Sequence, residues 1–284
     1  MFEVIFLFVL GLVAIVFATV QDLKTTIVYN WISYGLIVFA LGFRFFYSLF
    51  SGGDFLFFYQ GLIGLGIFWG LSNVFYYGKL FAGGDSRIFM ALGAVLPIYY
   101  SLTSNLKIFG LFILLFLLAG GIYGLIFTVY FGVKNFSKFR KDFSLKFKKK
   151  KSFIYSFLIL AIVCLFLGLF FEMFFYLGIV VFIVPYFYLG VKSIDDVCMV
   201  RKKLTKDLIP GDWLVKDLKV GKVLIKANWD GLSEENIKLL KKKKKEVVIR
   251  AGIQFLPVFL ISYLLLFGVI IFDLFGVLLR VVGF

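Results

Sequence analysis

Residues 4–20 read VIFLFVLGLVAIVFATV, a run without a single charged side chain. A helix that crosses a bilayer needs ~20 mostly apolar residues, so this run is close to the required length. Only Glu3 precedes it as a charged residue, whereas a secretory signal starts with a basic region and ends in a small-residue cleavage site. We therefore interpret this segment as a retained first membrane span.

The composition of the whole chain has the same character. Of its 284 residues, 62% are hydrophobic and 40 are Phe, and the mean hydropathy is +1.02. A soluble domain has about 45–50% apolar residues, so we expect a membrane protein. The chain contains no His, and its two cysteines, Cys164 and Cys198, are far apart. This excludes catalysis by Ser-His-Asp or Cys-His groups and His-ligated zinc or haem. We expect no metal and no cofactor.

Further apolar runs predict an all-α polytopic protein with about eight transmembrane helices. They lie at about 2–20, 31–50, 55–77, 87–103, 107–133, 153–191 and 251–279. A continuous helix over 153–191 would be roughly twice as long as the bilayer is thick, so we divide it into two spans with a turn near Glu172. A seven-span arrangement with one long bent helix is the alternative. The predicted organisation is a core of five spans (1–133), a basic loop (134–152), two further spans (153–191), a small α+β domain (192–250) and a last span (251–284).

The positive charges predict the orientation. If the N-terminus lies outside, the loops at about 21–30, 78–87, 134–152 and 192–250 lie inside, and they hold 28 of the 31 Lys and Arg residues. Positive residues concentrate on the cytoplasmic side of membrane proteins. We therefore expect a multi-pass protein of the cell membrane with its N-terminus outside. The clusters would contact anionic lipid headgroups rather than nucleic acid.

The polar segment 192–250 contains short β-rich runs at 210–226, separated by Pro210-Gly211 and Gly221. They indicate a small antiparallel sheet. Ser233 is a candidate N-cap for a helix that we expect to continue through the lysines toward the last span. In the membrane segments, glycines at small-xxx-small spacing, such as Gly66 and Gly70, predict close helix packing.

Two acids stand out at the predicted cytoplasmic face. Asp22 directly follows the first span, and Asp85 opens the fourth. Two complete spans separate them, so both lie on the same side of the membrane. Two carboxylates at one depth can act as an aspartyl protease, in which one takes a proton from water and the other donates to the scissile carbonyl. Close carboxylates share one proton and titrate together.

The two glycines before Asp85 add to this interpretation. Gly83 and Gly84 remove side-chain bulk and permit unusual backbone angles, so that a peptide backbone could approach the carboxylate. The residues alone leave a simpler interpretation open, in which Gly-Gly-Asp is a normal loop with an Asp N-cap and Asp22 is an ordinary helix-end residue.

Together, these residues resemble the type IV prepilin peptidase family, and most closely its archaeal preflagellin and prepilin peptidases. The resemblance is carried by Asp22 with the following Asn30 and by the Gly83-Gly84-Asp85 element. Three later segments add to it: Pro210–Asp212, Asp230–Glu235 and Gly252–Pro257. The family motif is Gly-x-Gly-Asp, and its first Gly is Ala82 here. The tetracysteine zinc insert of many bacterial relatives is missing from this sequence, so we expect no zinc.

The resemblance implies a membrane aspartyl endopeptidase with Asp22 and Asp85 as its catalytic residues. Its partners would be membrane-inserted preproteins of the archaellum or type IV pilus, each with a basic leader in the cytoplasm and a hydrophobic segment in the bilayer. Lys24 and Arg87 could tune the acid pair or orient the substrate, although anchoring by the positive-inside rule also explains them. Asn30 could cap the second span or contact the substrate.

The basic leader would need acids near the site, since the cytoplasmic face is strongly basic. Acids of the small domain could provide local attraction: Asp195, Asp196, Asp207, Asp212, Asp217 and Asp230.

Two rival functions remain. A presenilin-like intramembrane protease also uses Gly-x-Gly-Asp with a second Asp, but its acids lie deeper and it carries a Pro-Ala-Leu-Pro element that is missing from this sequence. A cation transporter or channel could use the same acid pair for binding, but such proteins tend to have repeated halves and broken helices near the midplane.

Overall fold

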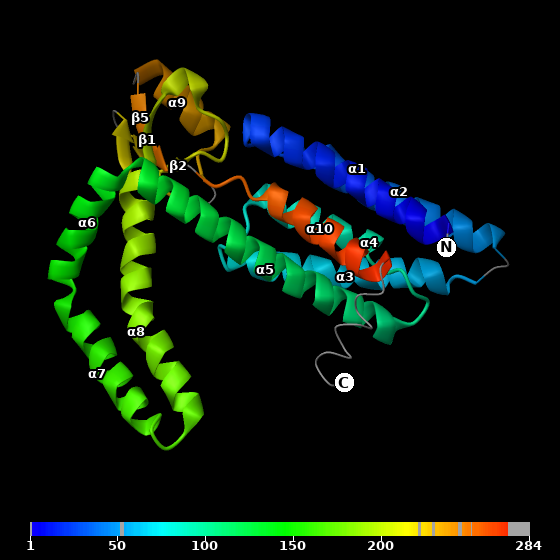
Figure 1. The fold of residues 1–284 in the computed structure, drawn as a ribbon. Coiled ribbons are helices and arrows are strands. Elements are labelled where there is room, and N and C mark those ends of the chain that lie inside the picture. Colours follow the sequence, from blue (N-terminus) through cyan, green and yellow to red (C-terminus); the bar gives the residue numbers. More distant parts are fainter. Residues whose placement is uncertain are drawn as a thin grey trace. The chain divides into compact units, whose positions relative to one another are not determined.

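The structure is a computed structural model that describes residues 2–51, 54–220, 223–228, 231–243, 246–250 and 252–271. The chain forms two compact units, one of residues 1–123 with 253–284 and one of residues 124–252. The fold is mostly helical, with a small region of strands in the C-terminal half of the sequence (Figure 1). This confirms the predicted class of a mostly helical protein with a small strand-containing part.

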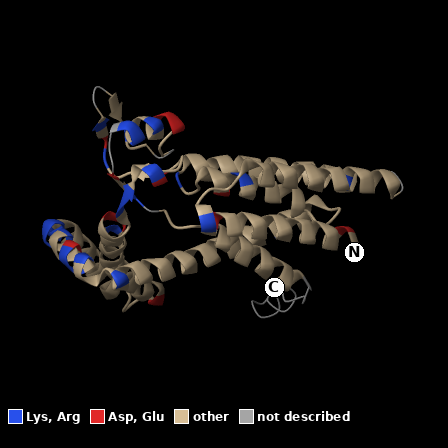
Figure 2. Ribbon diagram, turned by 90° about the horizontal axis from the view of Figure 1, so that it is seen from above, with Lys and Arg blue, Asp and Glu red and all other residues tan. Residues whose placement is uncertain are grey.

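The first unit is built from helices. They are α1 (Phe2–Thr25), α2 (Asn30–Phe50), α3 (Leu56–Tyr77), α4 (Gly83–Val95), α5 (Leu102–Lys134, which continues into the second unit) and α10 (Leu256–Ile271). Charged residues are sparse along these helices (Figure 2). The predicted last span extends to residue 279, and its part beyond Ile271 lies outside the described residues.

The described helices confirm a membrane protein but not the number of eight spans. Four are long and apolar enough to cross a bilayer: α1, α2, α5 and the segment Glu172–Cys198. A fifth span results if α6 (Phe136–Lys149) and α7 (Lys151–Leu167), which are bent by 76° relative to each other, count as one. Helix α4 has 13 residues and is ~20 Å long at 1.5 Å per residue, which is shorter than the ~30 Å hydrocarbon layer.

The early end of α4 has a clear physical cause. Pro97 has no N–H to continue the helix, and the next two N–H groups, of Ile98 and Tyr99, donate to Asn105 Oδ1 at 3.1 and 3.0 Å. The predicted span 87–103 is therefore replaced by a helix that ends at Val95 and an irregular segment before α5.

Arg44 of α2 donates hydrogen bonds to the carbonyl groups that have no helical partner at the end of α4. Its side chain is fully buried, and its guanidinium donates to the carbonyls of Ala94 at 2.9 Å, of Val95 at 3.2 Å and of Pro97. A fourth bond of 3.0 Å reaches Phe57 O. Arg44 is an exception to the predicted charge distribution, and its burial explains why: it serves as a helix C-cap.

Helix α4 lies at the centre of the first unit, and its residues from Ile88 to Val95, apart from the half-buried Met90, are buried. It packs against α1, α2 and α3. A Cβ added to Gly64 or Gly93 would come within 2.5 Å of a carbonyl oxygen of the other residue, so α3 and α4 approach each other at this glycine pair. The expected close packing at Gly66 and Gly70 is wrong, because both face open space.

The second unit contains a helical hairpin of α7 and α8 (Glu172–Ser193). The turn between them ends at Glu172, so the 153–191 stretch forms two helices with a turn at the predicted place. Gly178 allows the helices to approach closely, since a Cβ there would lie 2.8 Å from Leu165 Cγ.

The predicted basic loop 134–152 is largely a helix, α6. Its aromatic side chains recur every three or four residues: Phe136, Phe139, Phe143 and Phe147. Successive ring centroids are 5.6–6.4 Å apart, and Phe147 stacks on Tyr186 of α8 at 6.2 Å. This i, i+3, i+4 pattern gives α6 an apolar face, which the dense lysines concealed in the sequence.

The small strand-containing part also lies in the second unit. Strand β5 (Glu246–Arg250) pairs antiparallel with β1 (Val200–Leu204) and β2 (Trp213–Leu214), and β3 (Leu218–Val220) pairs with β4 (Val223–Ile225). A π-helix, η1 (Ile194–Cys198), a 3₁₀ turn, η2 (Thr205–Asp207), and helix α9 (Glu234–Lys243) complete it.

The predicted N-cap is confirmed, because Ser233 Oγ accepts the N–H of Asn236 at 3.3 Å. The expected continuation of the helix to the last span is wrong, because β5 intervenes.

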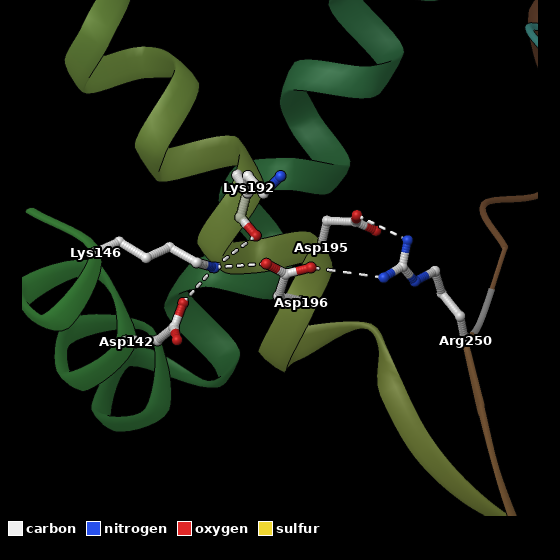
Figure 3. A network of polar contacts seen from close by, with 6 residues as sticks. All are labelled: Asp142, Lys146, Lys192, Asp195, Asp196 and Arg250. Atoms are coloured by element: carbon white, nitrogen blue, oxygen red, sulfur yellow. Dashed lines mark hydrogen bonds and ion pairs between the residues drawn. The ribbon is translucent and has the colours of Figure 1, made fainter. Parts of the chain in front are cut away.

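A network of charged residues ties α6, η1 and β5 together (Figure 3). It consists of Asp142, Lys146, Lys192, Asp195, Asp196 and Arg250. Lys146 Nζ lies 2.6 Å from Asp142 and 2.7 Å from Asp196, and it donates to the Lys192 carbonyl at 3.1 Å. Arg250 contacts Asp195 at 3.0 Å and Asp196 at 3.5 Å.

Three acids that were expected to attract a basic leader are thus already paired with cations of this chain. Asp195 and Asp196 belong to the network of Figure 3, and Asp212 lies 2.7 Å from Lys203 Nζ. Asp217 accepts the N–H of Ala227 at 2.8 Å, and Asp230 lies outside the described residues. An attraction of the leader by these paired acids is therefore not supported.

Candidate active site

Asp22 lies in the last turns of α1, which continues past the apolar run to Thr25. Its side chain is buried, and its Oδ2 accepts the N–H of Leu256 at 3.4 Å. Leu256 is the first residue of α10, and the free N–H groups of a helix N-terminus are favourable partners for a carboxylate. Thr19, one turn earlier in α1, donates to the Leu256 carbonyl at 3.4 Å.

The backbone around Asp22 is fixed by a second residue of the same segment. Gln254 Nε2 donates to the carbonyls of Asp22 at 3.1 Å and of Leu23 at 3.2 Å. The hydroxyl of Tyr123, in α5, donates to the Gln254 carbonyl at 2.9 Å, and it lies near enough to feel the charge of Asp22. The residues before α10 thus connect α1 with α5 at the candidate site.

Asp85 is the third residue of α4 and half-buried. Ala82 is the N-cap, so Asp85 itself is not the cap, and its Oδ2 accepts the Ala82 N–H at 3.3 Å. Its neighbour Ser86 is tied to α3, because Ser72 Oγ lies 2.7 Å from the Ser86 carbonyl and 2.6 Å from its Oγ.

The two acids lie within range of each other's charge. The charge of Asp22 acts on Asp85, and so does that of Arg87. Helices α1 and α4 also pack against each other. The structure therefore brings the two predicted acids to one region of the first unit, each at the N-terminus of a helix: Asp22 at that of α10 and Asp85 at that of α4.

The backbone conformation of Gly83 and Gly84 differs from the prediction. Neither adopts a left-handed backbone conformation, since both lie in the first turn of α4. A Cβ on Gly84 would lie 3.2 Å from Val28 Cβ and Cγ2, whereas one on Gly83 would meet nothing closer than 3.7 Å. Gly84 therefore allows the start of α4 to approach the segment that follows Asp22.

The remaining predicted site residues have mixed outcomes. Arg87 acts on Asp85 through its charge. Lys24 is exposed in the last turn of α1, where the helix dipole favours a cation. Asn30 is exposed and does not cap α2, because the N-cap is Tyr29, whose N–H donates to Gln21 Oε1 at 3.1 Å.

Sequence reasoning missed Gln254, Tyr123 and Val28 as parts of the site. Gln254 lies in the segment Gly252–Pro257, which contributed to the family resemblance, so its position carried a signal. Tyr123 is one of 15 tyrosines in the chain, and nothing in its local sequence distinguishes it. Within the described ranges, no three His, Cys, Asp or Glu side chains cluster as metal ligands would.

The fold and site define a helical membrane protein in which two interacting carboxylates lie at helix ends. Comparison with protein families makes the class specific: the model of the type IV leader peptidase family matches residues 7–129. That stretch includes Asp22, Asp85 and their glycines. This part of the chain is similar to the type IV leader peptidase family, a family of proteases, and the match confirms the resemblance seen in the sequence. No curated protein and no solved structure matches the chain.

Proposed function

We propose that the protein is a membrane aspartyl endopeptidase that removes the basic leader from archaellin-like or type IV pilin-like preproteins at the cytoplasmic membrane face. The observation that carries this proposal is the placement of the two acids: Asp22 lies near the end of α1 and Asp85 at the start of α4, two helices that pack against each other, and the acids lie within range of each other's charge. Both acids lie in the region that matches a leader peptidase family, and the sequence has no His for another hydrolytic mechanism.

The proposed reaction uses the two carboxyl groups as a pair that shares one proton. The ionised group takes a proton from a water molecule, whose oxygen then attacks the carbonyl carbon of the scissile peptide bond. The protonated group donates its proton to the carbonyl oxygen, which gives a neutral tetrahedral diol. When the C–N bond breaks, the amine takes up a proton from one carboxyl group, and a proton of the diol returns to the other. The pair is then ready for another water molecule.

The substrate geometry follows from the predicted orientation. Loops with 28 of the 31 basic residues would lie in the cytoplasm, where they would also contact anionic lipid headgroups. In this orientation the acid pair, at the end of α1, would lie on the same side. A preprotein whose hydrophobic segment lies in the bilayer would present the junction with its basic leader at the same depth.

Cleavage of a defined substrate tests the proposal. Purified protein in lipid nanodiscs is mixed with a synthetic preprotein that has a basic leader and a hydrophobic segment, and the products are identified by mass spectrometry. We expect Asp22→Asn and Asp85→Asn each to abolish cleavage. Glu172→Gln is the matched control, since this exposed acid lies in the other unit and hydrogen-bonds to Tyr176.

The proposal is wrong if either Asp variant cuts at the wild-type rate. Cleavage within the hydrophobic segment of a substrate that has no leader would instead indicate a presenilin-like protease. A wild-type protein that cuts nothing but conducts or transports cations would indicate the third function.

A further inference from the structure

We propose that Gln254 is a positioning residue for Asp22, and that Tyr123 holds Gln254 in place. The inference rests on the proposed function, because it assigns to both residues a role in the reaction of the acid pair. It is carried by the hydrogen bonds that connect the segment before α10 with the end of α1.

The end of α1 explains why such a residue is needed. The last carbonyls of a helix have no partner within it. The Asp22 carbonyl still accepts the N–H of Thr26 at 2.8 Å. The next N–H, of Ile27, instead faces Thr25 Oγ1 at 3.4 Å, so the Leu23 carbonyl loses its helical bond. Gln254 Nε2 supplies the missing donor at 3.2 Å.

The helix ends abruptly at this point. Thr26 has a φ of 56°, a left-handed conformation that is unfavourable for a β-branched residue. The last turn of α1, which carries Asp22, therefore depends on contacts from outside the helix. Gln254 gives it two of them.

The same short segment also holds the carboxylate. Gln254 fixes the backbone of Asp22, and two residues later the N–H of Leu256 donates to its Oδ2. The Tyr123 hydroxyl fixes the Gln254 backbone from α5. Without the amide of Gln254, the last turn of α1 can shift against α10, and Asp22 can shift against Asp85.

A shift of this kind affects the chemical step more than substrate binding. A misplacement of ~1 Å at reacting groups costs about 100-fold in rate. We therefore expect Gln254→Met, which keeps the side-chain length and removes both donors, to lower kcat by about 10–100-fold and to leave KM within about twofold. Tyr123→Phe should lower kcat by a smaller factor of about 3–10.

The two residues should not act independently. If Tyr123 works by placing the Gln254 side chain, Tyr123→Phe will have little further effect in the Gln254→Met background. Tyr130→Phe is the matched control on α5, since the Tyr130 hydroxyl contacts only the exposed Lys134 among the hydrogen bonds described for it. A purely structural role for Gln254 would instead lower the amount of folded protein and leave kcat per folded molecule unchanged.

The experiment measures kcat, KM and thermal unfolding of these variants in nanodiscs, together with amide hydrogen exchange of Thr26. Gln254→Met should speed exchange at Thr26, because its N–H bonds to the Asp22 carbonyl. Wild-type kcat in Gln254→Met, or unchanged exchange at Thr26, overturns the positioning role. If the wild type itself does not cleave, the proposed function fails and the catalytic role of Gln254 fails with it. The exchange result then shows separately whether Gln254 holds the end of α1.

Discussion

Removing the guanidinium of Arg44 should destabilise the first unit strongly. The side chain is fully buried, and three of its bonds go to carbonyls at or just after the end of α4. The carbonyls of Ala94 and Val95 have lost their helical partners, because the N–H groups of Ile98 and Tyr99 bond to Asn105 instead, and the Pro97 carbonyl lies beyond the helix end. Arg44→Met keeps much of the apolar stem and leaves the carbonyls without a donor.

The size of the effect follows from these bonds. A buried acceptor left without a partner costs about 1–3 kcal/mol. Three such carbonyls, taken at the low end because the variant no longer buries a charge, give about 3 kcal/mol. For a chain of this size, 1 kcal/mol corresponds to roughly 2 °C in Tm, so we expect Tm to fall by about 6 °C. Arg44→Lys should be intermediate, since an ammonium lacks the planar fork of donors.

Thermal unfolding in detergent, followed by far-UV circular dichroism, measures this change. Wild-type Tm for Arg44→Met would refute the capping role of Arg44. Gly61 provides a second test, because a Cβ there would lie 2.5 Å from Arg44 Cδ. Gly61→Ala should therefore cost about 1–3 kcal/mol through overpacking.

Two further variants control for the cost of replacing Gly61 with Ala. Gly66→Ala on the same helix faces open space and should not destabilise. In an Arg44→Ala background only the looser contact of 3.2 Å with Leu41 Cδ2 remains, so Gly61→Ala should cost less there, which gives a coupling of about 0.5–3 kcal/mol. Additive effects of the two substitutions would contradict the contact.

Three further outcomes are expected. Gly84→Ala should lower the cleavage rate about 10–100-fold, because its Cβ would lie 3.2 Å from Val28 and shift Asp85. Gly83→Ala should retain most of the activity. Equal losses in both variants would contradict the role of Gly84. Asn105→Ala should lower Tm by several °C, because the N–H groups that it accepts lose their partner; an unchanged melting curve would argue against it. Cleavage should have both an acidic and a basic limb in its pH profile, because full protonation or full ionisation of the acid pair removes one of the two roles, and a chelator should leave the rate unchanged.

Hydropathy predicted the helical membrane class and the position of most helices, but it misplaced the end of α4. Residues Leu96–Tyr100 are as apolar as the helix before them, so a count of apolar residues continues across Pro97. The helix ends because Asn105 and Arg44 take over its N–H and carbonyl groups. Such partners come from other helices and are not visible in a local window.

Helix α6, inside the predicted basic segment 134–152, was not predicted for a different reason. Its lysines suggested a solvated connection, and the phenylalanine spacing that forms the apolar face of α6 was overlooked. The small domain shows a related effect: β5 pairs with β1 across more than 40 residues of sequence, so the lysine-rich run before it gave no sign of a central strand.

The acids were predictable because charged residues are rare and costly in apolar segments. Asp22 and Asp85 each interrupt or border such a segment, and both lie in the region matched by the leader peptidase family. Their supporting residues were not predictable in the same way. Gln254 is 232 residues away from Asp22 in the sequence, and its contact exists only because α1, α5 and α10 meet.

The contacts at the two ends of α4 should have different roles, one in catalysis and the other in stability. The start of α4 is fixed near the candidate site by Gly84 against Val28 and by Ser86 against Ser72, and its other end is fixed by Arg44. Water does not compete for polar contacts inside an apolar helix bundle, so each contact holds its group firmly. Loss of Arg44 acts more than two helical turns away from Asp85 and should therefore appear mainly in stability. Loss of Gln254 or crowding at Gly84 acts next to the acids and should appear mainly in kcat, so the two kinds of variant should separate when Tm is plotted against kcat.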